Sequence, residues 1–418
     1  MSTTGTTTGT TPGTDSSGTN PSGGPGVGKA GRRGALLVKL LNSHGALIGI
    51  AVLAFLLLVW APGSMSTFRL GNLGKYCALA LASMGVGLAW GRGGMLVMGQ
   101  GVFFGLGAYA MAMHMKLEAA GPGEVPDFMT LYGDGTMPFW WEPFRSGPFT
   151  LFAIVALPAA VSFLLGYAIL KRRVKGAYFA ILTQAMAVAF ATLLIATIKQ
   201  TGGFNGLNTF STVFGHNLYN PEVQKNLYRL AAGLVILFLV ILWQLYRSRY
   251  GELLVATRDA EERIRFLGYD PANIKLVAFM AAAVMASIGG AVFVPIAGII
   301  SPSNVDAAAS IMLLAGVALG GRASLFGPAL GAIAVGYGRS TLSERYPTKW
   351  TYFLGALFIV VVLFLPGGVA SLWTKLRSWW SSSVTERRAT VSAGEPTRDG
   401  LDHGLDHGLE PAQRTASA

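Results

Sequence analysis

Charged side chains are scarce in this chain of 418 residues. Asp, Glu, Lys and Arg make up only 12% of it, where a soluble domain carries about 25%. Hydrophobic residues make up 52%, and they gather in runs of about 20, the length of helix that crosses a bilayer. The composition therefore excludes an ordinary soluble domain and predicts an all-α polytopic membrane protein.

Several chemical motifs are also missing. The single cysteine, Cys77, excludes an internal disulfide framework. There is no G-x-x-x-x-G-K-[ST] loop, no H-E-x-x-H and no G-x-S-x-G, so we expect no ATPase site, no metal site and no catalytic residue in this chain. Asp306 is the acidic residue nearest to a hydrophobic run, which does not favour coupling to protons or sodium ions.

Ten hydrophobic segments follow one another between two polar tails. We place them at 42–62, 71–91, 94–115, 149–170, 176–197, 230–247, 276–298, 307–321, 323–338 and 350–372. Only Gly321 and Arg322 separate the eighth from the ninth, so this short pair is expected to be bent or re-entrant. The tails, 1–40 and 374–418, lack large apolar side chains and are predicted to be disordered, which leaves 41–373 as the membrane domain.

The basic residues indicate the orientation. With the N-terminus inside, 22 of the 32 lysines and arginines fall in the tails and loops on the inner side. Cytoplasmic loops carry such an excess, so both termini are predicted to be cytoplasmic. This bias accounts for the net charge of +12 without nucleic acid as a partner.

Residues 251–276, called the elbow below, are the longest charged run between hydrophobic segments. Ala260, Ile264 and Leu267 recur at helical spacing and predict one apolar face, with the charged residues pointing elsewhere. Gly268 is typical of a helix end, and Asp270 before Pro271 of the start of the next helix. The pattern alone fits a surface that a partner grips and an ordinary solvated helix equally well.

Uncharged polar residues inside the hydrophobic segments are the second candidate site. Gln100 follows a glycine in the third segment, and Thr183 and Gln184 lie together in the fifth. A buried amide must find a hydrogen-bond partner, which can be a neighbouring helix or a neutral polar solute such as urea. The glycine-rich run 201–206 forms either a simple turn or a bent end of such a path.

Four stretches identify a family. They are GQGVFFGLGAY at 99–109, VKGAYFAI at 174–181, TGGFNGL at 201–207, and ALGG at 318–321 with LFGP at 325–328. Together they resemble the membrane permeases of ABC importers of the branched-chain amino-acid type, over roughly 40–373. The elbow from Arg258 to Gly268 resembles the cytoplasmic coupling loop of that family, which docks on the ATPase.

Two further features resemble the second permease of the urea-importer subgroup. One is the loop with PDFMTLYG at 126–133 and MPFWWEPF at 137–144, and the other is Thr183-Gln184-Ala185. The resemblance implies a second permease, two cytoplasmic ATPase subunits that use ATP and magnesium, and an extracytoplasmic solute-binding protein. It also implies a bacterial inner membrane location.

The resemblance places two groups of functional residues. The substrate pathway is expected at Gln100, Phe104, Thr183, Gln184, Gly203, Asn205 and Gly206. Coupling to the ATPase is expected at Arg258, Asp259, Glu261, Glu262, Arg265, Leu267 and Gly268. Urea is the expected solute. Branched-chain amino acids or short amides are the alternative, followed by a self-sufficient urea channel, which would need no coupling loop.

Overall fold

The computed structural model describes residues 45–174 and 176–347, with isolated positions at 349, 352, 353, 355, 356, 359, 363 and 368. Contacts divide the chain after Leu53, and apart from the helix over Gly45–Ser64 everything below concerns the unit that starts at Ala54. The two predicted tails lie outside the described residues, as does most of the tenth predicted segment.

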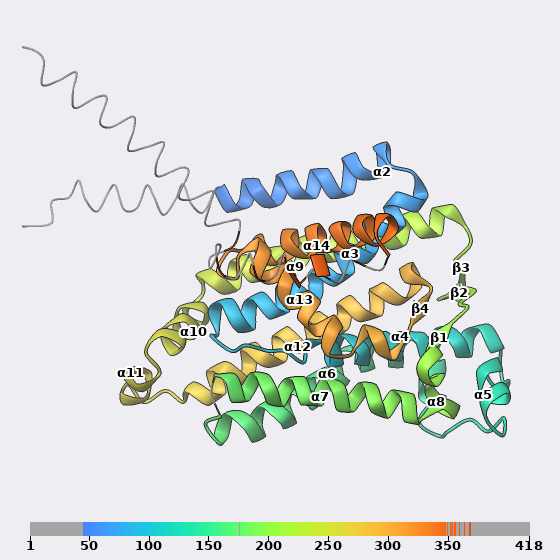
Figure 1. Cartoon of the computed structure of the whole chain (residues 1–418), viewed down its shortest axis with the longest axis horizontal. Coiled ribbons are helices and arrows are strands. Elements are labelled where there is room, and N and C mark those ends of the chain that lie inside the picture. Colours follow the sequence, from blue (N-terminus) through green and yellow to red (C-terminus); the bar gives the residue numbers. More distant parts are fainter. Residues whose placement is uncertain are drawn as a thin grey trace, which may run out of the picture. The chain divides into compact units, whose positions relative to one another are not determined.

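The described residues are almost entirely helical (Figure 1), as the sequence predicts. The long helices are α3 (Thr67–Val86, continued by η2, Gly87–Arg92), α4 (Gln100–Ala120), α6 (Gly147–Lys171), α7 (Ala177–Ala196), α9 (Pro221–Arg247), α12 (Pro271–Ala297), α13 (Ala307–Gly320) and α14 (Gly327–Arg345). Shorter helices are η1 (Leu56–Trp60), α2 (Ala61–Ser64), α5 (Asp127–Tyr132), η3 (Glu142–Arg145), α8 (Ile198–Thr201), η4 (Gly203–Asn205), α10 (Arg249–Asp259), α11 (Glu261–Phe266) and η5 (Pro302–Asn304).

Seven helices of the described residues are long and apolar enough to cross a membrane, which confirms a polytopic membrane protein. They are Gly45–Ser64, Thr67–Arg92, Gly147–Lys171, Ala177–Ala196, Pro221–Arg247, Pro271–Ala297 and Pro302–Gly320. The segments predicted at 94–115 and 323–338 correspond to α4 and α14. Polar residues keep these two helices below the hydropathy of a span. The predicted count of ten spans is therefore not confirmed.

Helix α12 is the centre of the bundle and packs against α3, α4 and α6. Small residues allow this close approach: a Cβ on Gly290 would collide with the backbone of Phe104, and one on Gly85 with the backbone of Ala282. Gly101 and Gly105 of α4 both lie against Val305, where a larger residue would not fit. The glycines of α4 therefore serve helix packing.

The third hydrophobic segment begins later than predicted. Between Gly93 and Gly99 the chain is not helical, and α4 starts only at Gln100. Gly94 has φ +68°, a left-handed conformation that glycine adopts without strain. Met95 and Val97 of this apolar segment are buried, and the Gly93-Gly94 pair before them is the local signal in the sequence that a helix is interrupted here.

Helices α13 and α14 form a closely packed hairpin. Gly316 lies against Ala332 and Gly320 against Gly327, and α14 also packs on α3. Whether this pair is re-entrant stays a prediction. Four short strands complete the described residues: β1 (Leu207–Asn208) pairs antiparallel with β4 (Ile299–Ile300), and β2 (Thr212–Val213) with β3 (His216–Asn217). In Figure 1 the strands lie at one end of this unit, and α10 and α11 at the other.

Candidate functional site

The elbow contains the end of α10, the short helix α11 and a turn before α12. The helix end at Gly268 and the helix start at Asp270 lie where the sequence predicts them, whereas the break between α10 and α11 at Ala260 was not predicted. The Ser248 hydroxyl accepts from the Gly251 N–H and caps α10. Gly268 has φ +85° and ends α11 in the left-handed conformation. The Asp270 carboxylate accepts from the Ala272 N–H at 3.0 Å and caps α12, which continues into the bundle. The connection from α11 into a membrane helix is therefore short.

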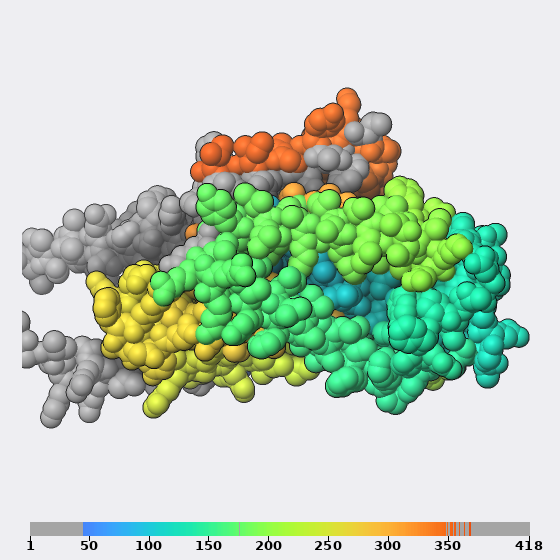
Figure 2. Space-filling model, turned by 90° about the horizontal axis from the view of Figure 1, so that it is seen from below, coloured from blue at the N-terminus to red at the C-terminus, as the bar shows by residue number. Residues whose placement is uncertain are grey.

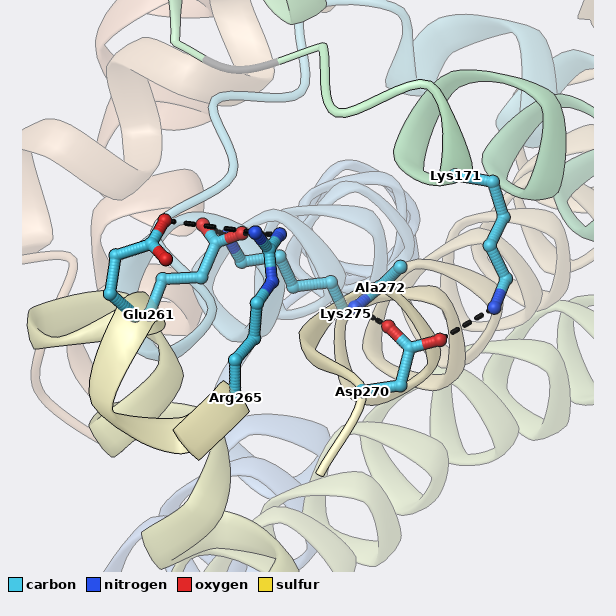
Figure 3. Close-up of polar contacts among 7 residues, drawn as sticks. Lys171, Glu261, Arg265, Asp270, Ala272 and Lys275 are labelled. Atoms are coloured by element: carbon cyan, nitrogen blue, oxygen red, sulfur yellow. Dashed lines mark hydrogen bonds and ion pairs between the residues drawn. The ribbon is translucent and has the colours of Figure 1, made fainter. Parts of the chain in front are cut away.

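Glu261 is the centre of an ion-pair cluster in the elbow (Figure 3). Its carboxylate lies 2.9 Å from Lys275 Nζ and 3.0 Å from an Arg265 guanidinium nitrogen. The side chains of Glu261 and Lys275 are only 17% and 15% exposed. Because Lys275 belongs to α12, this cluster fixes α11 to the start of that helix. Glu262, also near Arg265 at 3.7 Å, is far more exposed.

A second ion pair joins the elbow to α6. Lys171, at the end of α6, lies 2.5 Å from the Asp270 carboxylate (Figure 3). The hydrogen bond from Lys171 holds the pKa of Asp270 below its ordinary value, and the N–H of Ala272 acts in the same direction. Asp270 therefore connects the ends of two membrane helices.

Arg258 fixes the elbow to the end of η2. Its guanidinium donates to the carbonyl oxygen of Gly91 at 2.6 Å and to the carboxylate of Asp259 at 2.7 Å. The hydrogen bond from Arg258 also lowers the pKa of Asp259. A Cβ on Gly94 would lie 2.6 Å from Arg258 Cγ, so glycine leaves room for this side chain. Contacts within this protein therefore hold the Arg258 side chain in place.

The apolar face predicted for the elbow is wrong. Ala260 separates α10 from α11 and is the N-cap of α11, so Ala260, Ile264 and Leu267 keep their helical spacing but do not share one exposed face. Ile264 is buried, whereas Leu267 is 71% exposed and its neighbour Phe266 is 90% exposed. The exposed apolar group therefore consists of Phe266 and Leu267, and the sequence analysis missed Phe266.

Two of the predicted pathway residues meet at the non-helical segment before α4. The Thr183 hydroxyl accepts from the Met98 N–H at 3.1 Å and donates to the Ala180 carbonyl. A Cβ on Gly99 would collide with the backbone of Thr183. Gln100 is buried and its amide nitrogen donates to the Ala282 carbonyl oxygen at 2.7 Å. The Thr183 hydroxyl and the Gln100 amide nitrogen thus form hydrogen bonds that stabilise the fold.

The amide oxygens of Gln100 and Gln184 differ from the groups just described in their hydrogen bonding. Gln100 Oε1 and Gln184 Oε1 are both buried and have no hydrogen-bond donor among the described residues. Buried acceptors without a donor are uncommon, because losing water costs free energy that nothing restores. Phe104, also buried, packs edge-on against Phe293 with ring centroids 5.4 Å apart.

The glycine-rich run after α7 forms a compact turn at the end of the unit where the four strands lie, called the strand end below. Gly203 and Gly206 have φ +57° and +68°, and a side chain on Gly206 would collide with the Ile300 carbonyl. Asn205 is exposed and donates to the Tyr132 hydroxyl at 3.3 Å. These residues lie beyond the end of α7, so the structure does not gather all the predicted pathway residues at one point.

A cavity of about 500 Å³, apolar over most of its lining but with charged groups in it, lies between α3, α13 and α14 and also touches α4 and α12, and sequence reasoning missed it. Its polar lining includes Lys75, Ser83, Asp306 and Arg339. Phe104 is the only predicted pathway residue that lines it. The signal in the sequence was Lys75, a charged residue inside a hydrophobic segment, together with Asp306 at the edge of another.

A bundle of apolar spans around a cavity that contains charged side chains is typical of a membrane transport permease. Residues 69–363 match the family described as "Branched-chain amino acid transport system / permease component", and the chain belongs to this family. It is therefore a multi-pass permease of the ABC importer type, in a bacterial inner membrane.

Relatives with established names support this membership. The high-affinity branched-chain amino acid transport system permease protein LivM of Escherichia coli K12 is 30% identical over 313 residues, which cover 69% of this chain and 67% of LivM. LivM of Salmonella typhimurium LT2 gives the same values. The autoinducer 2 import system permease protein LsrC of Photorhabdus luminescens is 28% identical over 165 residues, 38% of this chain and half of LsrC. No solved structure matches.

Proposed function

We propose that this chain is the membrane-spanning permease of an ATP-driven importer that moves urea into the cytoplasm. Its partners would be a second homologous permease, two cytoplasmic ATPase subunits that bind ATP and magnesium, and an extracytoplasmic solute-binding protein. Both termini and the elbow would face the cytoplasm. Family membership and the relatives support the importer class, and the urea assignment depends on the pathway glutamines.

The observation that carries urea is the pair of buried amide oxygens without donors. Urea presents four N–H donors around one carbonyl and has no charge. Gln100 Oε1 and Gln184 Oε1 could each accept from such a donor, and both oxygens are buried where a charged solute would lose its solvation. Either oxygen, without such a donor, would remain a buried and unsatisfied acceptor.

The elbow suits coupling because it is rigid. Three polar contacts join it to different parts of the bundle: Arg258 to the end of η2, Glu261 to Lys275 of α12, and Asp270 to Lys171 of α6. A movement of α11 would be transmitted to these helices at once. Phe266 and Leu267 are exposed and form the apolar contact that an ATPase subunit would grip, with the exposed Glu262 beside them.

Branched-chain amino acids are the second candidate solute. The named LivM relatives favour them, and so does the cavity between α3, α13 and α14. Its lining includes Asp306, Lys75 and Arg339, so it presents both a carboxylate and cationic groups. A zwitterion with an apolar side chain would match these charges and the neighbouring Leu79 and Met312, whereas urea would not need them.

Uptake of labelled urea and labelled leucine tests the two solutes. Cells that lack this chain are compared with cells complemented by the wild type, by Gln184→Leu and by Gln244→Leu. Gln244 is exposed on α9 and serves as the matched control. We expect loss of urea uptake alone, rescue by the wild type and by the control, and at least about a tenfold deficit with Gln184→Leu. Loss of leucine uptake alone would contradict the urea assignment.

A further inference from the structure

A second cavity of the bundle is apolar and lies apart from the polar residues discussed above. It has a volume of about 730 Å³ and is lined by α4, α6, α7 and the loop before α6. Leu106, Tyr109 and Met113 of α4 form its floor, and Ala156 of α6 and Leu193 of α7 stand on its two sides. In Figure 2 the two helices are green, and blue atoms of α4 are visible between them.

The cavity exists because α6 and α7 hardly touch. Helix α6 packs on α4 and α12, and α7 packs on α4 and α13, so the two consecutive helices diverge above α4. Tight interiors leave few voids larger than a water molecule. An apolar void of this size does not hold water well, since water would find few polar partners there. An apolar occupant therefore suits it better than water does.

The mouth of the cavity opens toward the bilayer. Phe152 of α6 and Leu193 of α7 line the cavity and are also 67% and 56% exposed. Both belong to helices that are long and apolar enough to cross the membrane, so a side chain exposed there meets hydrocarbon wherever no second permease covers it. The cavity is thus open to the membrane-facing surface, which favours an apolar occupant.

The two ends of the cavity differ in polarity. It begins at the middle of α6 and α7 and reaches the strand end, where Thr197, Gln200 and Trp140 complete the lining. Tryptophan is enriched where hydrocarbon meets the headgroups, because its ring is apolar and its N–H is polar. The cavity is thus apolar in its interior and polar at its rim. A phospholipid has the same sequence of an apolar acyl chain followed by a polar ester and headgroup region.

We propose that this cavity binds one acyl chain of a phospholipid from the leaflet at the strand end, opposite the elbow. The acyl chain would fill the space between α6 and α7, where the two helices hardly touch. Helix α7 also carries Thr183 and Gln184, so the bound lipid would hold the candidate pathway in position. This inference does not depend on which solute the permease carries.

Filling the cavity tests the proposal. Ala156→Trp places a large ring inside it, whereas Ala159→Trp changes a half-buried alanine of the same helix that does not line it. The full-length chain is purified with its partners in detergent, and bound phospholipid is counted by native mass spectrometry. We expect wild type and Ala159→Trp to retain one phospholipid more than Ala156→Trp. Equal phospholipid content in all three would overturn the proposal.

A photocrosslink tests the occupant without filling the cavity. Benzoylphenylalanine at Met113, inside the cavity, is compared with the same group at Met111, which lines a different pocket beside β2 and β3. In native membranes we expect a phospholipid adduct at position 113, and less or none at position 111. Crosslinking of position 113 to a second polypeptide, or no adduct, would show that a protein helix or nothing fills the cavity.

Discussion

The elbow and the candidate pathway differ in whether their buried polar groups have partners. In the elbow, the mostly buried side chains of Glu261 and Lys275 form an ion pair at 2.9 Å. On α4 and α7, the oxygens of Gln100 and Gln184 are buried with no donor among the described residues. Satisfied groups make a region stiff, and unsatisfied ones leave a region ready for a ligand. One region suits transmission of movement and the other suits binding.

The largest effect on stability is expected from Glu261→Leu. This change leaves Lys275, which is 15% exposed, without its carboxylate. We expect a loss of about 2 kcal/mol in the free energy of unfolding, because hydrogen bonds to charged groups contribute about 1.5–3 kcal/mol. Thermal unfolding in detergent measures it, with the more exposed Glu262→Leu as control. Equal losses in both variants would show that the Glu261 cluster adds no stiffness.

Arg258→Gln comes next. The variant loses the hydrogen bond to the Gly91 carbonyl and the pair with Asp259, so the elbow is less firmly joined to η2. We expect a loss of about 1 kcal/mol in stability and several-fold slower uptake at unchanged ATPase activity of the assembled importer. Arg263→Gln, an exposed change on α11, is the control. Uptake at the wild-type rate by Arg258→Gln would remove this contact from the coupling route.

Gln100→Leu should lower transport strongly while it changes stability little. The change removes a hydrogen bond to Ala282 but also an oxygen without a donor, so we expect a stability change within about 1 kcal/mol. Urea uptake should fall at least about tenfold. Thermal unfolding and labelled uptake are measured on the same variant. A loss of stability as large as that of Glu261→Leu, with normal uptake, would reduce Gln100 to a packing residue.

The smallest effect concerns pH. The pKa of Asp270 is lower in the folded chain than in the unfolded one, so its contribution is present above the unfolded pKa and is lost as pH falls through the folded pKa. The pair with Lys171 is largely exposed and contributes about 0.5 kcal/mol or less. Asp270→Asn should therefore be slightly less stable at pH 7 and equal to wild type in strong acid. A constant difference across that range would assign the effect to the helix cap alone.

Local signals in the sequence predicted much of this molecule. The apolar runs gave the membrane fold, and Gly268 and Asp270 marked helix ends correctly because caps depend on neighbouring residues. The same logic failed at Ala260. Its position after Asp259 carries no turn signal, yet α10 ends and α11 begins there.

The missed features depend on residues far apart in the sequence. The bond between Arg258 and Gly91 spans 167 positions, and that between Gln100 and Ala282 spans 182. The two cavities likewise require helices that the sequence does not place side by side. Without such contacts, the sequence could not show which half of the Gln100 amide is satisfied, and this is the half on which the urea proposal depends.

The bond between Met98 and Thr183 has a consequence for how the bundle can move. Residues 93–99 are not helical, so their backbone groups need protein partners wherever lipid could replace water. If α7 separated from this segment, the Met98 N–H would lose its acceptor and would need water or solute in place of the Thr183 hydroxyl. In a lipid environment the segment before α4 and this part of α7 would therefore move together. They could separate only where a polar path opened between them.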